Sequence, residues 1–131
     1  MLMKHKNFLN NKISINKFKE NKLIVATHNS GKLIEIKNLL KNVDVDIYSS
    51  IEMGLPVPKE TGSSFEENAY IKSSETTLIS GFASLSDDSG LVINALDGSP
   101  GIYSADWSGK NRSFSDAIRK IEYLMRNKTD Y

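Results

Sequence analysis

Residues 23–32 read Leu23-Ile24-Val25-Ala26-Thr27-His28-Asn29-Ser30-Gly31-Lys32. The first four form a short apolar run with β-branched residues, which predicts a buried strand, and the polar residues that follow predict a turn. Apolar residues then recur at helical spacing, so a helix is predicted over 32–41. A strand, a glycine-containing loop and a helix in this order are typical of an α/β protein.

Later segments continue this alternation. Further strands are predicted at 43–48, 82–85 and 91–93. A helix is predicted to begin at Ser63 or Ser64, because Ser64 and Glu67 have the spacing of a capping box. We therefore expect an α/β fold with a mixed sheet and flanking helices.

A final helix is predicted to follow Ser113, with Asp116 three residues on as a second capping signal. Its apolar residues recur as a stripe: Phe114, Ala117, Ile118, Ile121, Leu124 and Met125. Such a stripe favours contact with a core or a partner over a role in cofactor binding.

The composition limits the class of protein. The 131 residues are 39% hydrophobic and 25% charged, as in an ordinary globular domain. No apolar stretch approaches the roughly 20 residues needed to cross a bilayer, so we expect no membrane partner. The sequence has no cysteine, which excludes disulfides and thiolate chemistry and fits a cytoplasmic protein.

Charge is distributed unevenly along the chain. Six lysines and one acidic residue, Glu20, fall within the first 22 residues. Lysine alone is weak evidence for a nucleic-acid partner, so we expect none. We expect residues 1–21 to form a basic, Asn- and Lys-rich extension and residues 22–131 to form one domain.

The turn after the first strand has the chemistry of an anion-binding loop. A helix N-terminus presents unpaired backbone N–H groups and a positive dipole end to an anion. Gly31 lets the backbone approach closely, Asn29 can hydrogen-bond a phosphate or a base, and Lys32 adds a positive charge. Asn and Ser before a helix also serve as ordinary caps, so both interpretations stay open at this point.

A second polar turn, Asp87-Asp88-Ser89-Gly90, follows the predicted strand at 82–85. Adjacent carboxylates suit a hard cation such as Mg²⁺ and, with it, a phosphate ester. A carboxylate here could also orient water for attack on phosphorus. Neighbouring side chains on an extended segment point to opposite faces, so one Asp can serve the site while the other is structural. A solvated, exposed turn is the alternative.

A third polar cluster, Lys59-Glu60-Thr61-Gly62-Ser63, precedes the helix predicted at 64. Glu60 adds an acidic group that could serve the same site. A carboxylate near a helix N-terminus is also stabilising without any ligand, which is the alternative here.

The ordered clusters resemble the signatures of the Ham1 or inosine triphosphatase family. The matching blocks are Ala26-Thr27-His28-Asn29-Ser30-Gly31-Lys32, Glu60-Thr61-Gly62 with Phe65, Glu67, Asn68-Ala69 and Lys72, Ser86-Asp87-Asp88-Ser89-Gly90-Leu91, and Pro100-Gly101-Ile102-Tyr103-Ser104-Ala105. The resemblance implies an α/β fold of two lobes around a cleft, commonly as a homodimer. It also implies Mg²⁺-dependent hydrolysis of non-standard purine triphosphates, such as ITP, dITP and XTP, to the monophosphate and pyrophosphate.

Carried over residue by residue, the resemblance assigns roles. It implies that the triphosphate is held by Thr27, His28, Asn29, Ser30, Gly31 and Lys32. Asp88 would bind the metal and act as the base for water, Ser89 would contact the nucleotide, and Asp87 would support the site. Glu60 corresponds to a further metal contact, although many members have another acidic residue where this chain has Lys59.

The resemblance covers about Leu23 to Gly109. Family members continue with an aromatic Phe-Gly-Tyr-Asp-Pro type segment, a later lysine and a Ser-His-Arg motif that together recognise the purine, and this chain has none of these after Gly109. We therefore expect a fold that lacks the family's C-terminal portion. One hypothesis is a nucleoside triphosphatase whose base pocket is incomplete or supplied by a partner chain. The other is a non-enzymatic remnant or nucleotide-binding module without turnover.

Overall fold

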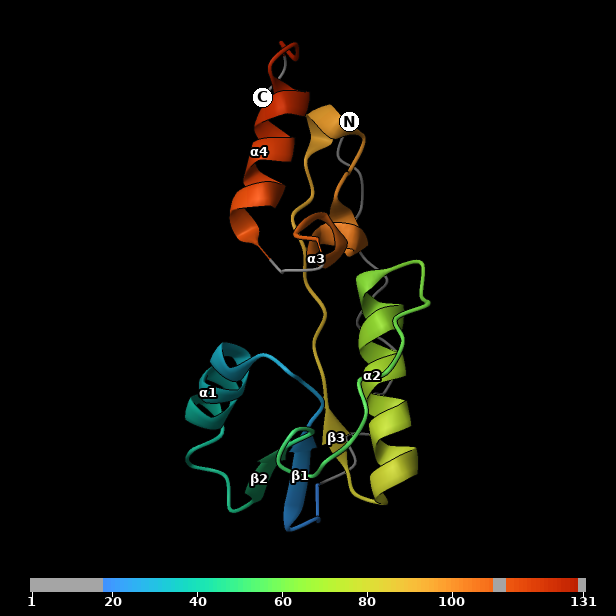
Figure 1. Ribbon diagram of the computed structural model, residues 1–131. Helices are drawn as coiled ribbons and strands as arrows, with labels where there is room; N and C mark the ends of the chain where they lie inside the picture. The colour runs from blue at the N-terminus through green and yellow to red at the C-terminus, as the bar shows by residue number, and fades with distance from the viewer. Residues whose placement is uncertain (1–17, 110–112, 130–131) are drawn as a thin grey trace, which may run out of the picture.

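The computed structural model describes residues 18–109 and 113–129 (Figure 1). Its strands are β1 (Lys22–Val25), β2 (Asp46–Ser49) and β3 (Ser84–Leu85). Its α-helices are α1 (Ser30–Leu39), α2 (Phe65–Ser80), α3 (Ser104–Trp107) and α4 (Phe114–Met125), and its 3₁₀-helices are η1 (Asn94–Leu96) and η2 (Gly101–Tyr103). The extension expected at 1–21 lies outside the described residues as far as residue 17.

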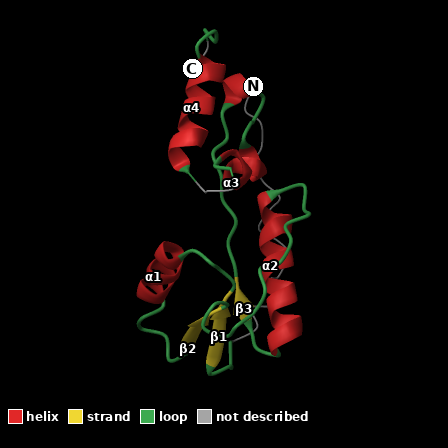
Figure 2. Cartoon of the chain, in the orientation of Figure 1, coloured by secondary structure: helices red, strands yellow, loops and turns green. Residues whose placement is uncertain are grey.

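The elements fall into two groups (Figure 2). One contains the three strands with α1 and α2, and the other contains η1, η2, α3 and α4. An extended segment after β3 leads from the first group to the second (Figure 1). This arrangement confirms the α/β class. None of the described helices combines the length and the apolar character needed to cross a membrane.

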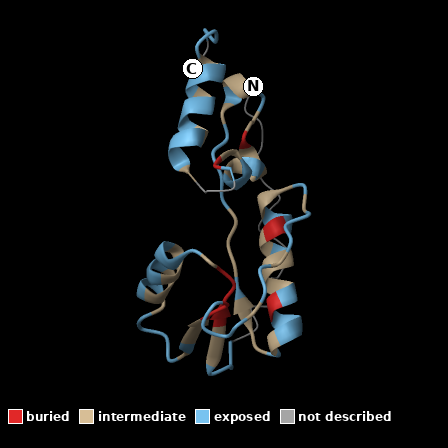
Figure 3. Ribbon diagram, viewed as in Figure 1, coloured by how far each residue is buried: buried red, intermediate tan, exposed pale blue. Residues whose placement is uncertain are grey.

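The three strands form a parallel sheet in the order β2-β1-β3. Lys22 of β1 aligns with Asp46 of β2, and Ile24 of β1 aligns with Ser84 of β3. Ile24 and Val25 on the central strand are fully buried, and they form the centre of the core (Figure 3). The apolar run of β1 is therefore the buried strand that its β-branched residues predict.

The strand predicted at 91–93 is absent from the described structure. We expected a mixed sheet, but antiparallel pairing within the described residues is limited to an isolated bridge between Val92 and Pro100. The carbonyl of Ile93 accepts a hydrogen bond from the backbone N–H of Leu96 at 3.0 Å. This bond turns the chain into η1 and uses a group that a strand would offer to its neighbour.

Helix α2 begins where the capping signal predicts. The hydroxyl of Ser64 accepts from the backbone N–H of Glu67 at 3.1 Å, and the Glu67 carboxylate accepts from the backbone N–H of Ser63 at 2.7 Å. The reciprocal bond of the box therefore reaches one residue before the cap. The helix ends at Ser80 and is capped by Gly81, whose φ of 74° is left-handed. The helix packs against β3.

Helix α4 forms as predicted, but its cap and its stripe differ from the prediction. Ser113 occupies the N-cap position without a capping hydrogen bond, and its hydroxyl lies 2.7 Å from that of Ser115. Phe114 and Ile118 on the stripe are 78% and 58% exposed. These side chains are therefore not core residues in the described structure, and contact with a partner stays a prediction.

Candidate active site

The polar clusters lie together at one edge of the sheet. β1 and β3 are adjacent and parallel, so the loops that follow them leave the sheet at the same, carboxyl edge. Figure 1 shows α1 following β1 across a short loop and the extended segment leading away from β3. Side chains from segments far apart in the sequence meet here.

Asn29 organises the loop between β1 and α1. Its side-chain oxygen accepts from the backbone N–H groups of Gly31 and Lys32, at 2.9 and 3.2 Å, which makes Asn29 the N-cap of α1. Its own backbone N–H donates to the hydroxyl of the buried Thr27 at 3.1 Å. The first turn of α1 contains no acidic residue. The cap thus fixes the loop, and the positive end of the α1 dipole has no carboxylate from its own first turn to neutralise it, which favours an anion there.

Two of the predicted loop residues lie apart from the charged contacts. His28 is half-buried and Ser30 is exposed at the start of α1. In the described part of the chain, neither side chain joins the lysine–carboxylate contacts below. Substrate contact by these two residues stays a prediction.

Lys32 joins the first turn of α1 to the turn after β3. Its ammonium pairs with the Asp87 carboxylate and donates to the hydroxyl of Ser89 at 3.1 Å. The Lys32 and Asp87 side chains are 29% and 42% exposed. A pair this exposed contributes only about 0–1 kcal/mol to stability. It serves mainly to bring two predicted site segments together.

Lys72 of α2 makes a second, more buried connection. Its Nζ lies 2.9 Å from Asp88 Oδ1 and 3.1 Å from Glu60 Oε1. The Lys72 and Asp88 side chains are only 14% and 10% exposed, whereas Glu60 is 39% exposed. The neighbouring carboxylates of the Asp-Asp turn thus pair with different lysines, as expected for side chains on opposite faces of an extended segment.

The pKa of Lys72 is raised above its ordinary value. Burial is the largest single influence and lowers this pKa, but the hydrogen bonds and negative charges of Asp88 and Glu60 together outweigh it. The ammonium is therefore charged at neutral pH.

The sequence alone predicted no role for Lys72. A signal for it existed, because Asn68 and Lys72 are four residues apart and share one face of α2. Asn68 is 2% exposed, and its side-chain oxygen accepts from the backbone N–H of Gly62 at 2.8 Å. Two polar residues on a buried helix face indicate a site, but the partner of Lys72 depends on how α2 packs on β3.

The Asp-Asp turn ends in Gly90, where there is no room for a side chain. A Cβ built on Gly90 would lie 2.3 Å from the carbonyl oxygen of Gly101 and 2.9 Å from Cε1 of Phe65. The backbone of the turn therefore passes against η2 and the start of α2. This close approach fixes the position of the turn and thus of the two aspartates that precede Gly90.

The carboxylates of Glu60 and Asp88 are the candidate metal ligands. The described residues contain no group of three or more His, Asp or Glu side chains arranged to hold a metal ion. Mg²⁺ in nucleotide sites is typically bound by one or two carboxylates, with water and substrate phosphates completing its coordination. Two carboxylates that converge on one ammonium fit this donor chemistry.

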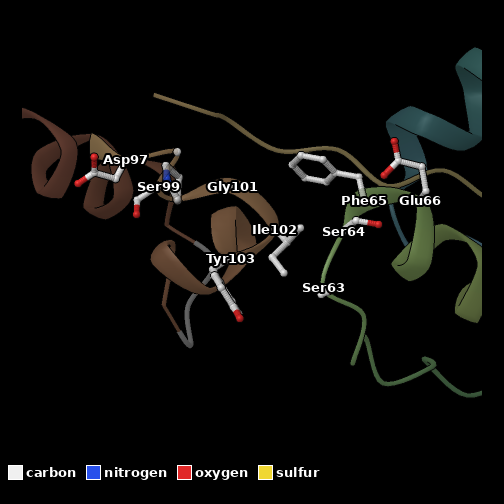
Figure 4. Close-up of a pocket in the computed structure, with 11 residues that line it drawn as sticks. Ser63, Ser64, Phe65, Glu66, Asp97, Ser99, Gly101, Ile102 and Tyr103 are labelled. Atoms are coloured by element: carbon white, nitrogen blue, oxygen red, sulfur yellow. The ribbon is translucent and has the colours of Figure 1, made fainter. Parts of the chain in front are cut away.

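A hollow of about 450 Å³ opens between the start of α2 and residues 97–103 (Figure 4). Phe65 and Ile102 contribute apolar surface to it, and Glu66 and Asp97 contribute carboxylates. Among the described residues that line it there is no lysine or arginine. The lysine–carboxylate cluster is therefore a better candidate than this hollow for binding an anion.

Comparison with known proteins identifies the family. The model of the Ham1 family matches residues 23–131. The chain belongs to the Ham1 family. The order of the polar clusters and the α/β fold thus agree with the family that the sequence resembles.

Ham1 relatives include proteins named dITP/XTP pyrophosphatase. That of Bartonella quintana is 53% identical over 104 residues, which make up 77% of this chain and 48% of the relative. That of Brucella melitensis is 50% identical over 111 residues, or 82% of this chain and 50% of the relative. The chain spans about half the length of the curated relatives it matches.

Solved Ham1 structures share the fold. The structure of a HAM1 protein from Coxiella burnetii superposes with a TM-score of 0.78 at 35% identity, covering 85% of this chain and 56% of that chain. The Staphylococcus aureus Ham1 protein gives a TM-score of 0.73 at 36% identity, covering 83% of this chain and 56% of that chain.

Proposed function

We propose that this chain hydrolyses non-standard purine nucleoside triphosphates, such as ITP, dITP and XTP, to the monophosphate and pyrophosphate. One observation carries the proposal: lysines from two helices, Lys32 and Lys72, meet the Asp87-Asp88 turn at the carboxyl edge of the sheet. Such a cluster offers positive charge for a triphosphate and a carboxylate for water. The names of the Ham1 relatives support this class of substrate.

The triphosphate would bind where α1 begins. The positive end of the α1 dipole lies there, and Lys32 in the first turn adds an ammonium. Because its pair with Asp87 is partly exposed, Lys32 can exchange this carboxylate for a phosphate oxygen at a small cost in free energy. Ser89, which already contacts Lys32, would then contact the nucleotide. The rest of the binding loop comprises Thr27, His28, Asn29, Ser30 and Gly31.

Asp88 and Glu60 would hold Mg²⁺. When bound, the ion would neutralise charge on the triphosphate and polarise its phosphoryl oxygens. Asp88 would also orient a water and accept its proton as the water attacks the α-phosphorus. The bond from this phosphorus to the bridging oxygen breaks, and pyrophosphate leaves. Asp87 would support the site by positioning Lys32.

We further propose that residues 22–131 form the catalytic domain, and that the protein acts in the cytoplasm as a homodimer. The exposed Phe114 and Ile118 on α4 support a contact with a second chain, since large apolar side chains gathered on one face favour association.

Pyrophosphate release tests the function. The purified chain is incubated with Mg²⁺ and each of ITP, dITP, XTP, ATP and GTP. We expect ITP, dITP and XTP to be cleaved in preference to ATP and GTP, and Asp88→Asn to lower the rate by about 10²-fold or more because it cannot accept the proton. Asp116→Asn is a matched control, since it changes an exposed carboxylate that pairs with Arg119 on α4.

A folded wild-type chain that releases no pyrophosphate would contradict the enzymatic proposal. Calorimetric titration with ITP and Mg²⁺ would then distinguish the alternatives. Binding without turnover would indicate a nucleotide-binding module, and no binding would indicate a remnant.

A further inference from the structure

Lys72 bridges carboxylates from two different segments. Glu60 lies in the loop before α2, and Asp88 lies in the turn after β3. The Lys72 Nζ is 3.1 and 2.9 Å from their nearest oxygens. An ordinary surface pair of this chain, Lys37 with Glu52, is longer at 3.6 Å, and its side chains are 39% and 49% exposed. The Lys72 contact is thus shorter, more buried and shared between two anions.

We propose that Lys72 competes with the divalent cation for Glu60 and Asp88, and so keeps both carboxylates paired until a triphosphate arrives. This inference rests on the proposed function, because it concerns the ligands of the proposed cation. Two carboxylates directed at one point repel each other unless positive charge lies between them. In the free protein, Lys72 supplies that charge.

Displacing Lys72 leaves its ammonium without a partner. At 14% exposure the side chain is mostly out of water, and an unpaired charge there is costly. The oxygens of a triphosphate provide new acceptors for it. The cation and the triphosphate should therefore bind with positive coupling, each weakly alone and both more tightly together.

Removing the charge of Lys72 should release the carboxylates for the cation. Lys72→Gln keeps a polar side chain, and we expect it to bind Mn²⁺, used as the probe, about tenfold or more tightly than the wild type without nucleotide. Free Mn²⁺ is followed by electron paramagnetic resonance, which reports binding independently of hydrolysis.

Two variants serve as controls. Lys37→Gln makes the same charge change in the surface pair with Glu52, and its Mn²⁺ affinity should stay within about twofold of wild type, because exposed charges are screened. Lys72→Arg retains the competing charge, so it should bind Mn²⁺ no more tightly than wild type.

Mn²⁺ affinity that is unchanged or weaker in folded Lys72→Gln would overturn the inference. If that variant does not fold, ¹⁵N NMR of lysine Nζ groups in the wild type provides the test. Saturating Mg²⁺ should shift the signal of the buried lysine, and an unchanged signal would overturn the inference. ITP cleavage by the wild type alongside unchanged Mn²⁺ affinity in Lys72→Gln would contradict this inference alone. Tightened Mn²⁺ binding without ITP cleavage would contradict only the proposed function.

Discussion

Replacing Gly90 by alanine should loosen the turn that carries the two aspartates. The new Cβ would lie 2.3 Å from the Gly101 carbonyl oxygen, 2.6 Å from Ser104 Oγ and 2.9 Å from Phe65 Cε1. All three contacts are repulsive. A backbone carbonyl and an aromatic ring cannot move aside as the end of a long side chain can, so the turn itself must shift.

The size of the effect follows from these contacts. Overpacking a tight position costs about 1–3 kcal/mol, and three close contacts favour the upper end of that range. Replacing glycine by alanine also restricts the unfolded chain, which offsets about 0.5–1 kcal/mol. Gly90 does not have a positive φ, so no backbone strain is added. The expected net loss is about 2 kcal/mol out of roughly 5–15 kcal/mol for a typical domain.

Urea unfolding followed by circular dichroism measures this loss. Gly54→Ala is the control, because its Cβ would meet nothing within 4 Å. Its φ of 63° adds about 1–2 kcal/mol of left-handed strain, and the restricted unfolded chain offsets about 0.5–1 kcal/mol of that, so its net loss should be about 1 kcal/mol or less. Gly90→Ala should therefore be the less stable of the two variants. A Gly90→Ala chain as stable as wild type would refute the close approach of the turn to η2.

The helix caps and one carboxylate give two further predictions. Ser64→Ala should lower the free energy of unfolding by about 1 kcal/mol, because it removes the acceptor for the Glu67 N–H. Ser113→Ala should change this free energy by less than about 0.5 kcal/mol, because Ser113 makes no side-chain capping bond. Equal losses in urea unfolding would contradict the assigned caps. Hydrogen bonds from Ser63 lower the pKa of Glu67 below its ordinary value of 4.5. The ionised carboxylate therefore stabilises the fold fully above pH 4.5, and this stabilisation is lost as the pH falls through the lowered pKa of the folded state. Glu67→Gln should flatten the acid limb of a stability–pH curve, and an unchanged slope would show that the hydrogen bonds do not form.

Local signals in the sequence predicted the features that depend on neighbouring residues. The β-branched run at Ile24 and Val25 is the buried centre of the sheet. Ser64 and Asn29 cap the helices that follow them, because a side chain two or three residues before an unpaired N–H can reach it without help from the rest of the fold.

Three features that depend on packing or on the local course of the backbone were not predicted. Lys72 has its role because α2 packs against β3, which brings its ammonium to Asp88, sixteen residues away in the sequence. The run at 91–93 has strand-like residues, but a strand also needs a neighbour, and the backbone there enters η1 instead. Ser113 shows that a capping sequence does not guarantee a capping bond.

³¹P NMR of ITP incubated with the wild-type chain and Mg²⁺ is the measurement that decides whether the lysine–carboxylate cluster is a catalytic site. Attack of water at the α-phosphorus predicts IMP and pyrophosphate in equal amounts, with Asp88→Asn slower by about 10²-fold or more. IDP and phosphate as products, or no turnover by the folded wild-type chain, would contradict the proposed hydrolysis.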